Sequence, residues 1–243
     1  MTTSTSMPNP AARPEAADSE DAALRRALAW THTARFLTTA SALAELPATE
    51  LPEIAFVGRS NAGKSSAINV LTQQKRLAFA SKTPGRTQHI NLFELGPKGA
   101  ADALFADLPG YGYAAVERNA KLRWQEVMAE YLAVRRSLSA IVVLVDSRLG
   151  FTEIDRKLLE FVAPRLANGS VKLLALLTKV DKLNRRDTAA ALRAAGEVLG
   201  EVTSAESEIS LAPFSALSRA GVDDAARVLH AWTHASFGAE HRP

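Results

Sequence analysis

An octapeptide, GRSNAGKS at residues 58–65, constrains this chain more than any other feature. It fits the phosphate-binding pattern G-x-x-x-x-G-K-[ST] without a mismatch. It stands between an apolar run at 54–57 and a stretch at 66–71 that can form a helix. In this context the glycines let backbone N–H groups turn inward, which creates an anion site at a helix N-terminus. We therefore expect a nucleoside triphosphate site, with Lys64 at the β- and γ-phosphates and the Ser65 hydroxyl on Mg²⁺.

A second motif, TKVD at residues 178–181, follows an apolar run at 171–177 that has the pattern of a buried parallel strand. It resembles the N-K-x-D signature with which GTPases bind guanine, with threonine at the asparagine position. The Asp181 carboxylate would accept hydrogen bonds from guanine N1–H and the N2 amine, and the Lys179 stem would lie along the base. Because the Thr178 hydroxyl cannot make all the bonds of an amide, the rigidity and affinity of the base loop stay open at this point.

Two further motifs follow predicted strands. The apolar run 103–106 ends in DLPG at 107–110, a D-x-x-G sequence in which Asp107 would reach Mg²⁺ through water and the Gly110 N–H would sense the γ-phosphate. Later, residues 213–216 close another strand, and the last N–H of this segment would bond guanine O6. Ligands of doubly wound sheets bind at the carboxyl ends of the strands. Four motifs in this order therefore predict one guanine nucleotide site.

The remaining element of such a site is a threonine that responds to the γ-phosphate. The segment 81–88 precedes a predicted strand at 89–95 and offers two candidates. Thr87 stands directly before the strand, where its hydroxyl would complete the Mg²⁺ shell and its backbone would touch the γ-phosphate. Thr83, beside Pro84, fits a turn residue better. We expect this segment to order with GTP and to loosen with GDP.

Apolar strands alternate with amphipathic stretches from Pro52 onward, which predicts an α/β fold. We expect a three-layer P-loop NTPase G domain with a mostly parallel sheet and helices on both faces. The expected organisation is a disordered tail at 1–22, an N-terminal arm at 23–52 with a short helix near 24–33, a GTP-binding domain at 53–237 and a frayed end at 238–243. Other expected helices cover residues 62–72, 119–135, 153–166, 187–199 and 219–235.

Composition sets consistent bounds on the class of protein. A chain of 243 residues suffices for one α/β domain with a covered core. It has no cysteine, which fits a reducing compartment. Its longest clean apolar run, residues 140–145, is too short to span a bilayer, and the N-terminus lacks the apolar core of a secretory signal. We therefore expect a cytoplasmic protein without a membrane partner.

The motif segments GRSNAGKSS, TPGRTQ, DLPGYGY and TKVDK together resemble the EngB (YsxC/YihA) family of ribosome-biogenesis GTPases, over roughly residues 30–235. This family belongs to the translation-factor-related class of TrmE-, Era-, EngA-, EngB- and Septin-like GTPases. The resemblance implies a monomeric, single-domain bacterial GTPase that acts on the precursor of the large (50S) ribosomal subunit, with its rRNA and proteins. It also implies a need for the protein in normal cell division and septation.

The resemblance implies GTP or GDP contacts through the phosphate loop, the switch segment, the D-x-x-G loop and the two base loops. It implies the Mg²⁺ ligands Ser65 and Thr87, to which we add Asp107 through water. We expect Lys64, Thr87 and Asn61 to form the catalytic set. Matched residue by residue, the nucleotide contacts are Gly58, Arg59, Ser60, Asn61, Ala62, Gly63, Lys64, Ser65, Gly85, Arg86, Thr87, Gln88, His89, Asp107, Leu108, Pro109, Gly110, Thr178, Lys179, Val180, Asp181, Phe214, Ser215 and Ala216.

The catalytic elements contain a gap at the residue after D-x-x-G. In Ras-like enzymes a glutamine there orients the attacking water, but this chain has Tyr111. A phenol cannot present a paired amide donor and acceptor, so slow intrinsic hydrolysis is expected. Asn61 offers a second possibility, because an asparagine at this place resembles that of potassium-activated GTPases, in which its amide oxygen holds K⁺. The alternative is that Asn61 only shapes the loop.

The charge distribution predicts a basic surface, which has two possible interpretations. The segment 1–22 holds one basic against four acidic side chains, whereas the remaining residues hold 28 basic and 22 acidic ones. The excess of basic side chains beyond residue 22 would attract RNA phosphates. Alternatively, these side chains form an ordinary solvated surface. Without a KH-type or RNP1 sequence, the ribosomal assignment rests on the resemblance. The alternatives are a division regulator that works by protein contacts and a GTPase of tRNA modification or small-subunit assembly. The basic residues noted are Arg118, Lys121, Arg123, Arg135 and Arg136, with Arg185 and Arg186 beyond the base loop.

Overall fold

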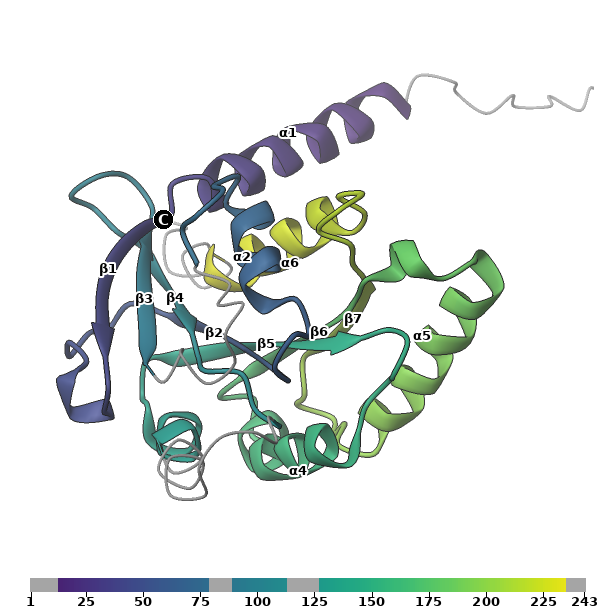
Figure 1. Ribbon diagram of the computed structural model, residues 1–243. Coiled ribbons are helices and arrows are strands. Elements are labelled where there is room, and N and C mark those ends of the chain that lie inside the picture. Colours follow the sequence, from purple (N-terminus) through teal and green to yellow (C-terminus); the bar gives the residue numbers. More distant parts are fainter. Residues whose placement is uncertain (1–12, 79–88, 113–126, 235–243) are drawn as a thin grey trace, which may run out of the picture.

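A seven-stranded sheet forms the centre of the molecule, with helices on both of its faces (Figure 1). The computed structural model describes residues 13–78, 89–112 and 127–234, with side chains from Ser19 onward. The strand order is β1-β3-β4-β2-β5-β6-β7. The strands are β1 (Arg35–Ala40), β2 (Glu53–Gly58), β3 (Ile90–Leu95), β4 (Ala103–Asp107), β5 (Leu138–Asp146), β6 (Lys172–Thr178) and β7 (Ile209–Pro213).

The sheet is parallel from β4 through β7, whereas β3 pairs antiparallel with both β4 and β1. Every residue of β2 and β4 is buried, and so are six of the seven residues of β6. Continuous burial follows from the helices on both faces, which leave these strands no solvated side. The expected α/β fold with a mostly parallel sheet is confirmed.

Two apolar clusters hold the layers together. On one face, α1 (Arg13–Thr31), α2 (Lys64–Leu71) and α6 (Val222–His234) pack through residues such as Trp30, Ile68 and Leu229. On the other face lie α4 (Glu153–Ala167), α5 (Arg185–Gly200) and a helical stretch at 127–134, packed through residues such as Leu132 and Leu166. Figure 1 shows α1, α2 and α6 on the side of the sheet opposite α4. Among the described residues, no helix is both long enough and apolar enough to cross a membrane.

The N-terminal region differs from the expectation. Helix α1 begins at Arg13 rather than near Leu24, and so it starts within the segment expected as a tail. Its first turns are rich in alanine and glutamate, which are strong helix formers, and its last turns are anchored because Ala27 and Trp30 are buried. Once the docked end is nucleated, propagation toward the N-terminus costs little. Residues 1–12 and 235–243 lie outside the described chain.

The expected N-terminal arm is also partly wrong, because residues 35–40 form an edge strand of the sheet. Strand β1 pairs antiparallel with β3, with Phe36 opposite Phe93 and Ala40 opposite Ile90. An ion pair between Arg35 and Glu94 supports the pairing, with 2.9 Å between Nε and Oε1. The structural unit therefore begins before residue 53.

The other predicted helices agree with the structure to within three residues at each described end. Helix α4 begins at the predicted Glu153, where Thr152 and Asp155 form a capping box. Helix α5 starts two residues earlier than expected because Asn184 caps it by accepting the Asp187 N–H at 2.9 Å. Of the helix expected at 119–135, residues 127–134 are described and helical.

Candidate guanine nucleotide site

Strand β2 delivers the phosphate loop to the carboxyl edge of the sheet, and α2 begins directly after it. Gly58 passes so close to β5 that an added Cβ would lie 2.8 Å from the Leu144 carbonyl oxygen. Gly63 caps α2 with φ 98°, a left-handed conformation that favours glycine. Asn61 also has positive φ, at 65°. These turns place the backbone of residues 59–63 around the N-terminus of α2, as an anion site requires.

Lys64 and Asp107 meet at the centre of this edge. Lys64 is the first residue of α2 and Asp107 the last of β4, and the Lys64 ammonium donates to Asp107 Oδ1 in a buried ion pair. The second carboxylate oxygen, Oδ2, is buried and has no hydrogen-bond partner among the described residues. A metal-bound water would satisfy this oxygen, so the residues present fit a hydrated Mg²⁺ beside the phosphates.

Thr178, at the end of β6, links the base loop to the phosphate loop. Its hydroxyl donates to the Ala62 carbonyl oxygen at 2.6 Å, and the Val145 carbonyl oxygen lies 3.2 Å away. The side chain is buried, so this bond is shielded from water. The rigidity left open by the threonine substitution is thus supplied, because one short hydroxyl bond ties residues that lie 116 positions apart in the chain.

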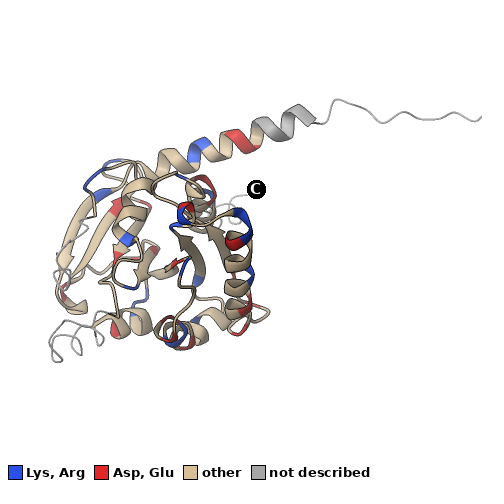
Figure 2. Cartoon of the chain, turned by 45° about the vertical axis from the view of Figure 1, so that its right-hand side comes forward, with Lys and Arg blue, Asp and Glu red and all other residues tan. Residues whose placement is uncertain are grey.

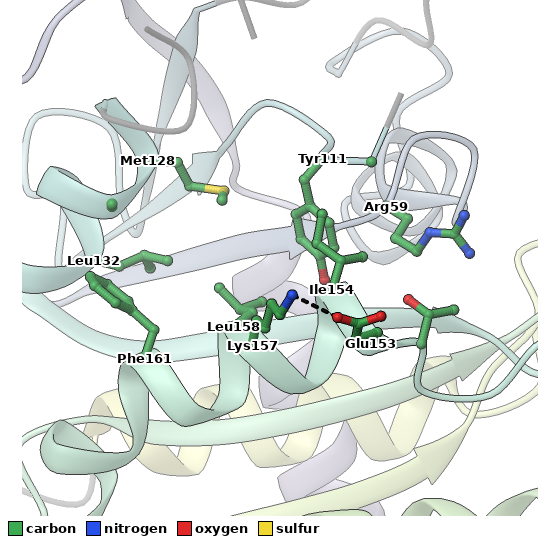
Figure 3. Close-up of a pocket in the computed structure, with 12 residues that line it drawn as sticks. Arg59, Tyr111, Met128, Leu132, Glu153, Ile154, Lys157, Leu158 and Phe161 are labelled. Carbon is green, nitrogen blue, oxygen red and sulfur yellow. Dashed lines mark hydrogen bonds and ion pairs between the residues drawn. The ribbon is translucent and has the colours of Figure 1, made fainter. Parts of the chain in front are cut away.

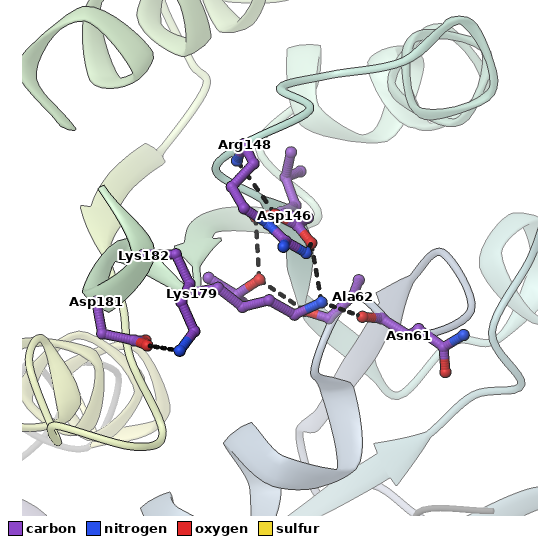
Figure 4. Close-up of polar contacts among 9 residues, drawn as sticks. Asn61, Ala62, Asp146, Arg148, Lys179, Asp181 and Lys182 are labelled. Carbon is purple, nitrogen blue, oxygen red and sulfur yellow. Dashed lines mark hydrogen bonds and ion pairs between the residues drawn. The ribbon is translucent and has the colours of Figure 1, made fainter. Parts of the chain in front are cut away.

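Lys179 is held in position by two acceptors, one of them unforeseen in the sequence (Figure 4). Its φ is 60°, and its ammonium donates to the Asn61 carbonyl oxygen at 2.7 Å and to Asp146 Oδ2 at 2.8 Å. Asp146 also accepts two bonds from the Arg148 guanidinium and one from the Arg148 N–H, and these bonds together with Lys179 hold the pKa of the Asp146 carboxyl far below its usual range. Asp146 directly follows the apolar run 140–145. Its position at the end of a predicted strand was the signal from which a role in the site could have been predicted.

Asp181 is oriented by the loop after β7. The Ser215 hydroxyl donates to Asp181 Oδ1 at 2.6 Å, and this bond, with the nearby Lys182, lowers the pKa of the Asp181 carboxyl. Ser215 is itself buried and accepts the N–H groups of Leu217 and Ser218. The ionised carboxylate is therefore favoured and held in place, which suits the predicted role of Asp181 as a double acceptor for guanine.

The loop after β7 also touches the base loop through its backbone. The Phe214 carbonyl oxygen accepts the Val180 N–H at 3.3 Å, and the Phe214 ring is buried. Gly221 has φ 73°, and a Cβ there would lie 1.9 Å from the Pro213 carbonyl oxygen, so only glycine fits this return. The structure thus brings the predicted segments 178–181 and 214–216 together.

Tyr111 faces away from the phosphate loop, toward α4. Its side chain is buried, and its hydroxyl donates to Asp155 Oδ1 at 2.7 Å. Burial and the Asp155 carboxylate raise the pKa of this phenol far above its usual value. The hydrogen bonds between Tyr111 and the phosphate loop run through the backbone, because the Ser60 N–H donates to the Tyr111 carbonyl and the Tyr111 N–H donates to the Gly58 carbonyl. The side chain therefore does not stand where a water-orienting glutamine would.

Tyr111 forms one wall of a cavity of about 650 Å³ between the 127–134 helix and α4. Figure 3 shows its apolar floor and the ion pair of Lys157 with Glu153 at its edge. The Arg59 side chain lies at the same cavity, with its Nε buried and unpaired among the described residues. Arg59 is thus a phosphate-loop residue whose side chain lies beside the Tyr111 ring.

Part of the predicted site lies outside the described residues. Gly85, Arg86, Thr87 and Gln88 fall in the segment 79–88, so their predicted contacts stay predictions. His89 is described and exposed, and its Nδ1 lies 2.9 Å from the Ser41 hydroxyl. Among the described residues no group of three His, Cys, Asp or Glu could hold a metal. The predicted Mg²⁺ ligands Ser65 and Thr87 stay predictions, because Thr87 lies outside the described residues.

The basic surface inferred from the sequence needs one correction. Arg135 is not available for phosphates, because its guanidinium pairs with the buried Glu53, which also accepts the Tyr131 hydroxyl at 2.6 Å. Arg136 is exposed, and Arg118, Lys121 and Arg123 lie outside the described residues. Figure 2 shows that basic and acidic residues are interspersed along the outer helices.

The convergence of these loops at the carboxyl edge of the sheet is that of a P-loop GTPase. A family model described as 50S ribosome-binding GTPase matches residues 53–179. The probable GTP-binding protein EngB of Acidovorax ebreus is 59% identical over 207 residues, which cover 85% of this chain and 91% of that protein. Its counterpart in Albidiferax ferrireducens is 57% identical over 213 residues, covering 88% and 99%. The chain belongs to the EngB family of GTP-binding proteins.

Solved structures share the fold. The crystal structure of a probable GTP-binding protein EngB has a TM-score of 0.55 at 22% identity and covers 74% of this chain and 98% of that chain. The crystal structure of Era in complex with MgGDPNP and nucleotides 1506–1542 of 16S ribosomal RNA has a TM-score of 0.59 at 21% identity, with coverage of 76% and 57%. At these identities the likeness concerns the fold alone.

Proposed function

We propose that this protein is a Mg²⁺-dependent GTP switch in late assembly of the large ribosomal subunit. The observation that carries the proposal is the edge where Lys64, Asp107 and Thr178 meet, within the residues 53–179 that match a 50S ribosome-binding GTPase model. We place its action in the cytoplasm, as a monomer. A need for it in cell division and septation would follow if dividing cells run short of large subunits.

The residues divide the work between phosphates, metal and base. Lys64 would leave Asp107 Oδ1 for the β- and γ-phosphates, while the buried Asp107 carboxylate accepts from metal-bound water. Ser65 and Thr87 would supply hydroxyl ligands, and Mg²⁺, when bound, neutralises charge on the phosphates. Asp181, held by Ser215, selects guanine.

Slow GTP hydrolysis follows from the placement of the Tyr111 side chain. Its hydroxyl is bound to Asp155, so the side chain that follows D-x-x-G cannot orient a water molecule. Asn61 remains the residue proposed to hold K⁺. Its backbone carbonyl is occupied by Lys179, and its side chain is exposed and points away from Lys179 in Figure 4. The side-chain amide makes no hydrogen bond to the described residues.

Depletion of the protein tests the assembly role. The expected result is the accumulation of immature large subunits while small subunits form normally. Complementation by the wild type should restore large subunits, and Lys64→Ala should not, because it removes the phosphate contact. Loss of mature small subunits alone would favour the small-subunit alternative. Normal ribosome profiles with defective septation would favour the division regulator.

A further inference from the structure

We propose that the β1 edge of the sheet and the turn after α2 form a docking surface for an unpaired segment of RNA. In this surface Phe36 stacks on a base, and Lys75 and Arg76 bind the flanking phosphates. The inference rests on the proposed function and adds the contact chemistry. The residues of this surface lie far from the base-reading loop. Neither the sequence motifs nor the predicted nucleotide contacts assign a role to these residues.

Phe36 is an exposed aromatic residue in a defined position. Phe36 is 58% exposed, and the neighbouring Leu37 is 41% exposed. One edge of the Phe36 ring is fixed by Phe93, with ring centroids 6.2 Å apart at 67°. An isolated exposed phenylalanine needs no explanation, but here a cavity and two cations adjoin it.

The cavity beside Phe36 measures about 460 Å³ and is otherwise lined by Gln74, Lys75, Arg76 and Leu77. Both cations are exposed, and neither forms an ion pair with a described acidic residue. The adjacent Arg35, by contrast, is neutralised by Glu94. Two unneutralised positive charges beside an aromatic face form a site for a polyanion that carries flat apolar groups, which is the chemistry of single-stranded RNA.

The turn that carries the two cations is held in place before any ligand binds. The Gln74 N–H donates to the Asn69 carbonyl at 2.9 Å, and the Gln74 side chain donates to the Ala34 carbonyl at 2.5 Å. The Asn69 amide makes two bonds of 2.8 Å to the backbone of Ala78. A rigid turn loses little conformational entropy when it binds, which favours a recognition role.

The shape of β1 disfavours the obvious protein partner, an added β-strand. The register with β3 shifts between Phe36 and Thr38, so Leu37 is an extra residue in the ladder. Such a bulge twists an edge strand away from regular pairing. Recognition at this edge therefore runs through side chains. The same turn is followed in sequence by residues 79–88, which hold the predicted switch threonine.

Binding measurements with a fluorescent 12-nucleotide oligouridylate and with large-subunit precursors test the surface. Phe36→Ala should weaken both by about tenfold or more, Phe36→Tyr should retain binding, and Phe36→Leu should not, since stacking requires an aromatic face. Lys75→Glu with Arg76→Glu should lower the slope of log K against log salt for the oligouridylate by about 1.4, the value for two single-strand phosphate contacts. GTP affinity should not change in any of these variants.

Matched controls separate the surface from general effects. Phe161→Ala removes another exposed phenylalanine, on α4, and Arg193→Glu with Arg227→Glu reverses two exposed charges elsewhere. Both controls should bind like the wild type. If they weaken binding as much as the Phe36 and Lys75/Arg76 variants, the surface is not specific and the inference fails.

Cross-linking identifies the occupant. With p-benzoylphenylalanine at position 36, irradiation of the particle-bound protein should give a cross-link to RNA. A cross-link to a ribosomal protein alone, or none despite intact particle binding, would overturn the inference. If the wild type binds oligouridylate through this surface but ignores large-subunit precursors, the RNA surface stands and the large-subunit function falls.

Discussion

At the base-reading loop, the hydroxyl of Thr178 supplies the link to the phosphate loop that an asparagine amide would otherwise provide. Its 2.6 Å bond to the Ala62 carbonyl lies in a buried environment, where a hydrogen bond lost from one side leaves an unsatisfied group. The sequence predicted the position of this residue but not its partner, because the two residues are brought together only by the parallel pairing of β2, β5 and β6.

Exchange of the base-reading carboxylate tests specificity. Asp181→Asn should weaken GTP binding by about tenfold or more, because the charged acceptor of two guanine donors is lost. The same change should favour xanthosine triphosphate, whose base presents an acceptor toward the new amide. Competition binding with both nucleotides measures the exchange. Unchanged affinity and unchanged selectivity would remove Asp181 from the site.

The phenol of Tyr111 has a structural role in this account. Tyr111→Phe removes the bond to Asp155, which also caps α4 through Thr152, and should lower the free energy of unfolding by about 1–3 kcal/mol. GTP turnover should stay within about twofold of the wild type, because the phenol is bound to Asp155 and has no role in the chemistry. Urea denaturation and phosphate release measure the two quantities. A large loss of turnover in a folded variant would assign Tyr111 to the chemistry.

The potassium role of Asn61 can be separated from its loop role. Asn61→Ala keeps the backbone carbonyl that accepts Lys179, so the base-loop contact survives while the side-chain amide is removed. Turnover of the wild type should rise when Na⁺ is replaced by K⁺ at constant ionic strength, and the variant should not respond. Equal wild-type turnover in both salts would leave Asn61 as a loop residue in the isolated protein.

At the scale of elements, α1 is fastened to α6 by an aromatic and histidine cluster. Trp30 donates to Asp102 at 2.8 Å and lies edge-on to the rings of His230 and His234. The two histidine rings stack with centroids 4.2 Å apart, and His234 Nε2 lies 3.3 Å from Asp102. This cluster explains why α1 docks, and it could not be predicted from local sequence because its members come from three separate segments.

The cluster predicts a dependence of stability on pH. Burial, His234 and Arg26 lower the pKa of His230, against an opposing effect of Asp102, and burial with Arg219 lowers the pKa of His32. A histidine with a lowered folded pKa binds its proton more readily when unfolded, so stability is full above about pH 6.5 and falls as pH decreases toward the folded pKa. Denaturation from pH 8 to 5 should show this loss, and His230→Gln should reduce its slope. An unchanged slope would contradict the role of His230.

Elements with strong local signals were predicted well, and elements defined by packing were not. The apolar runs of β2, β5 and β6 and the start of α4 are local, so their positions follow from the sequence, whereas the cap of α5 at Asn184 was missed. Strand β1 has two exposed apolar residues and gains its identity from pairing with β3. The early start of α1 follows from its docked end. The pairing of β1 is not encoded within its own segment, and the helix-forming residues at the start of α1 extend a helix that is anchored elsewhere.

At the scale of the whole molecule, sheet topology decides which motifs meet. Segments separated by over a hundred residues share one edge because β2, β4, β5, β6 and β7 run parallel. The order of motifs was sufficient to predict this convergence, whereas the holding contacts were not. Asp146 and Arg148, which position Lys179, carry no motif of their own and become visible only at the end of β5.

The central claim is a GTP-controlled association with the large subunit. Co-sedimentation of the full chain with large-subunit precursors, with a non-hydrolysable GTP analogue or with GDP, tests it most directly, with mature small subunits as the control. Binding should be tighter with the GTP analogue, weaken as salt rises and be absent from small subunits. Equal binding with both nucleotides, or a preference for small subunits, would contradict the account.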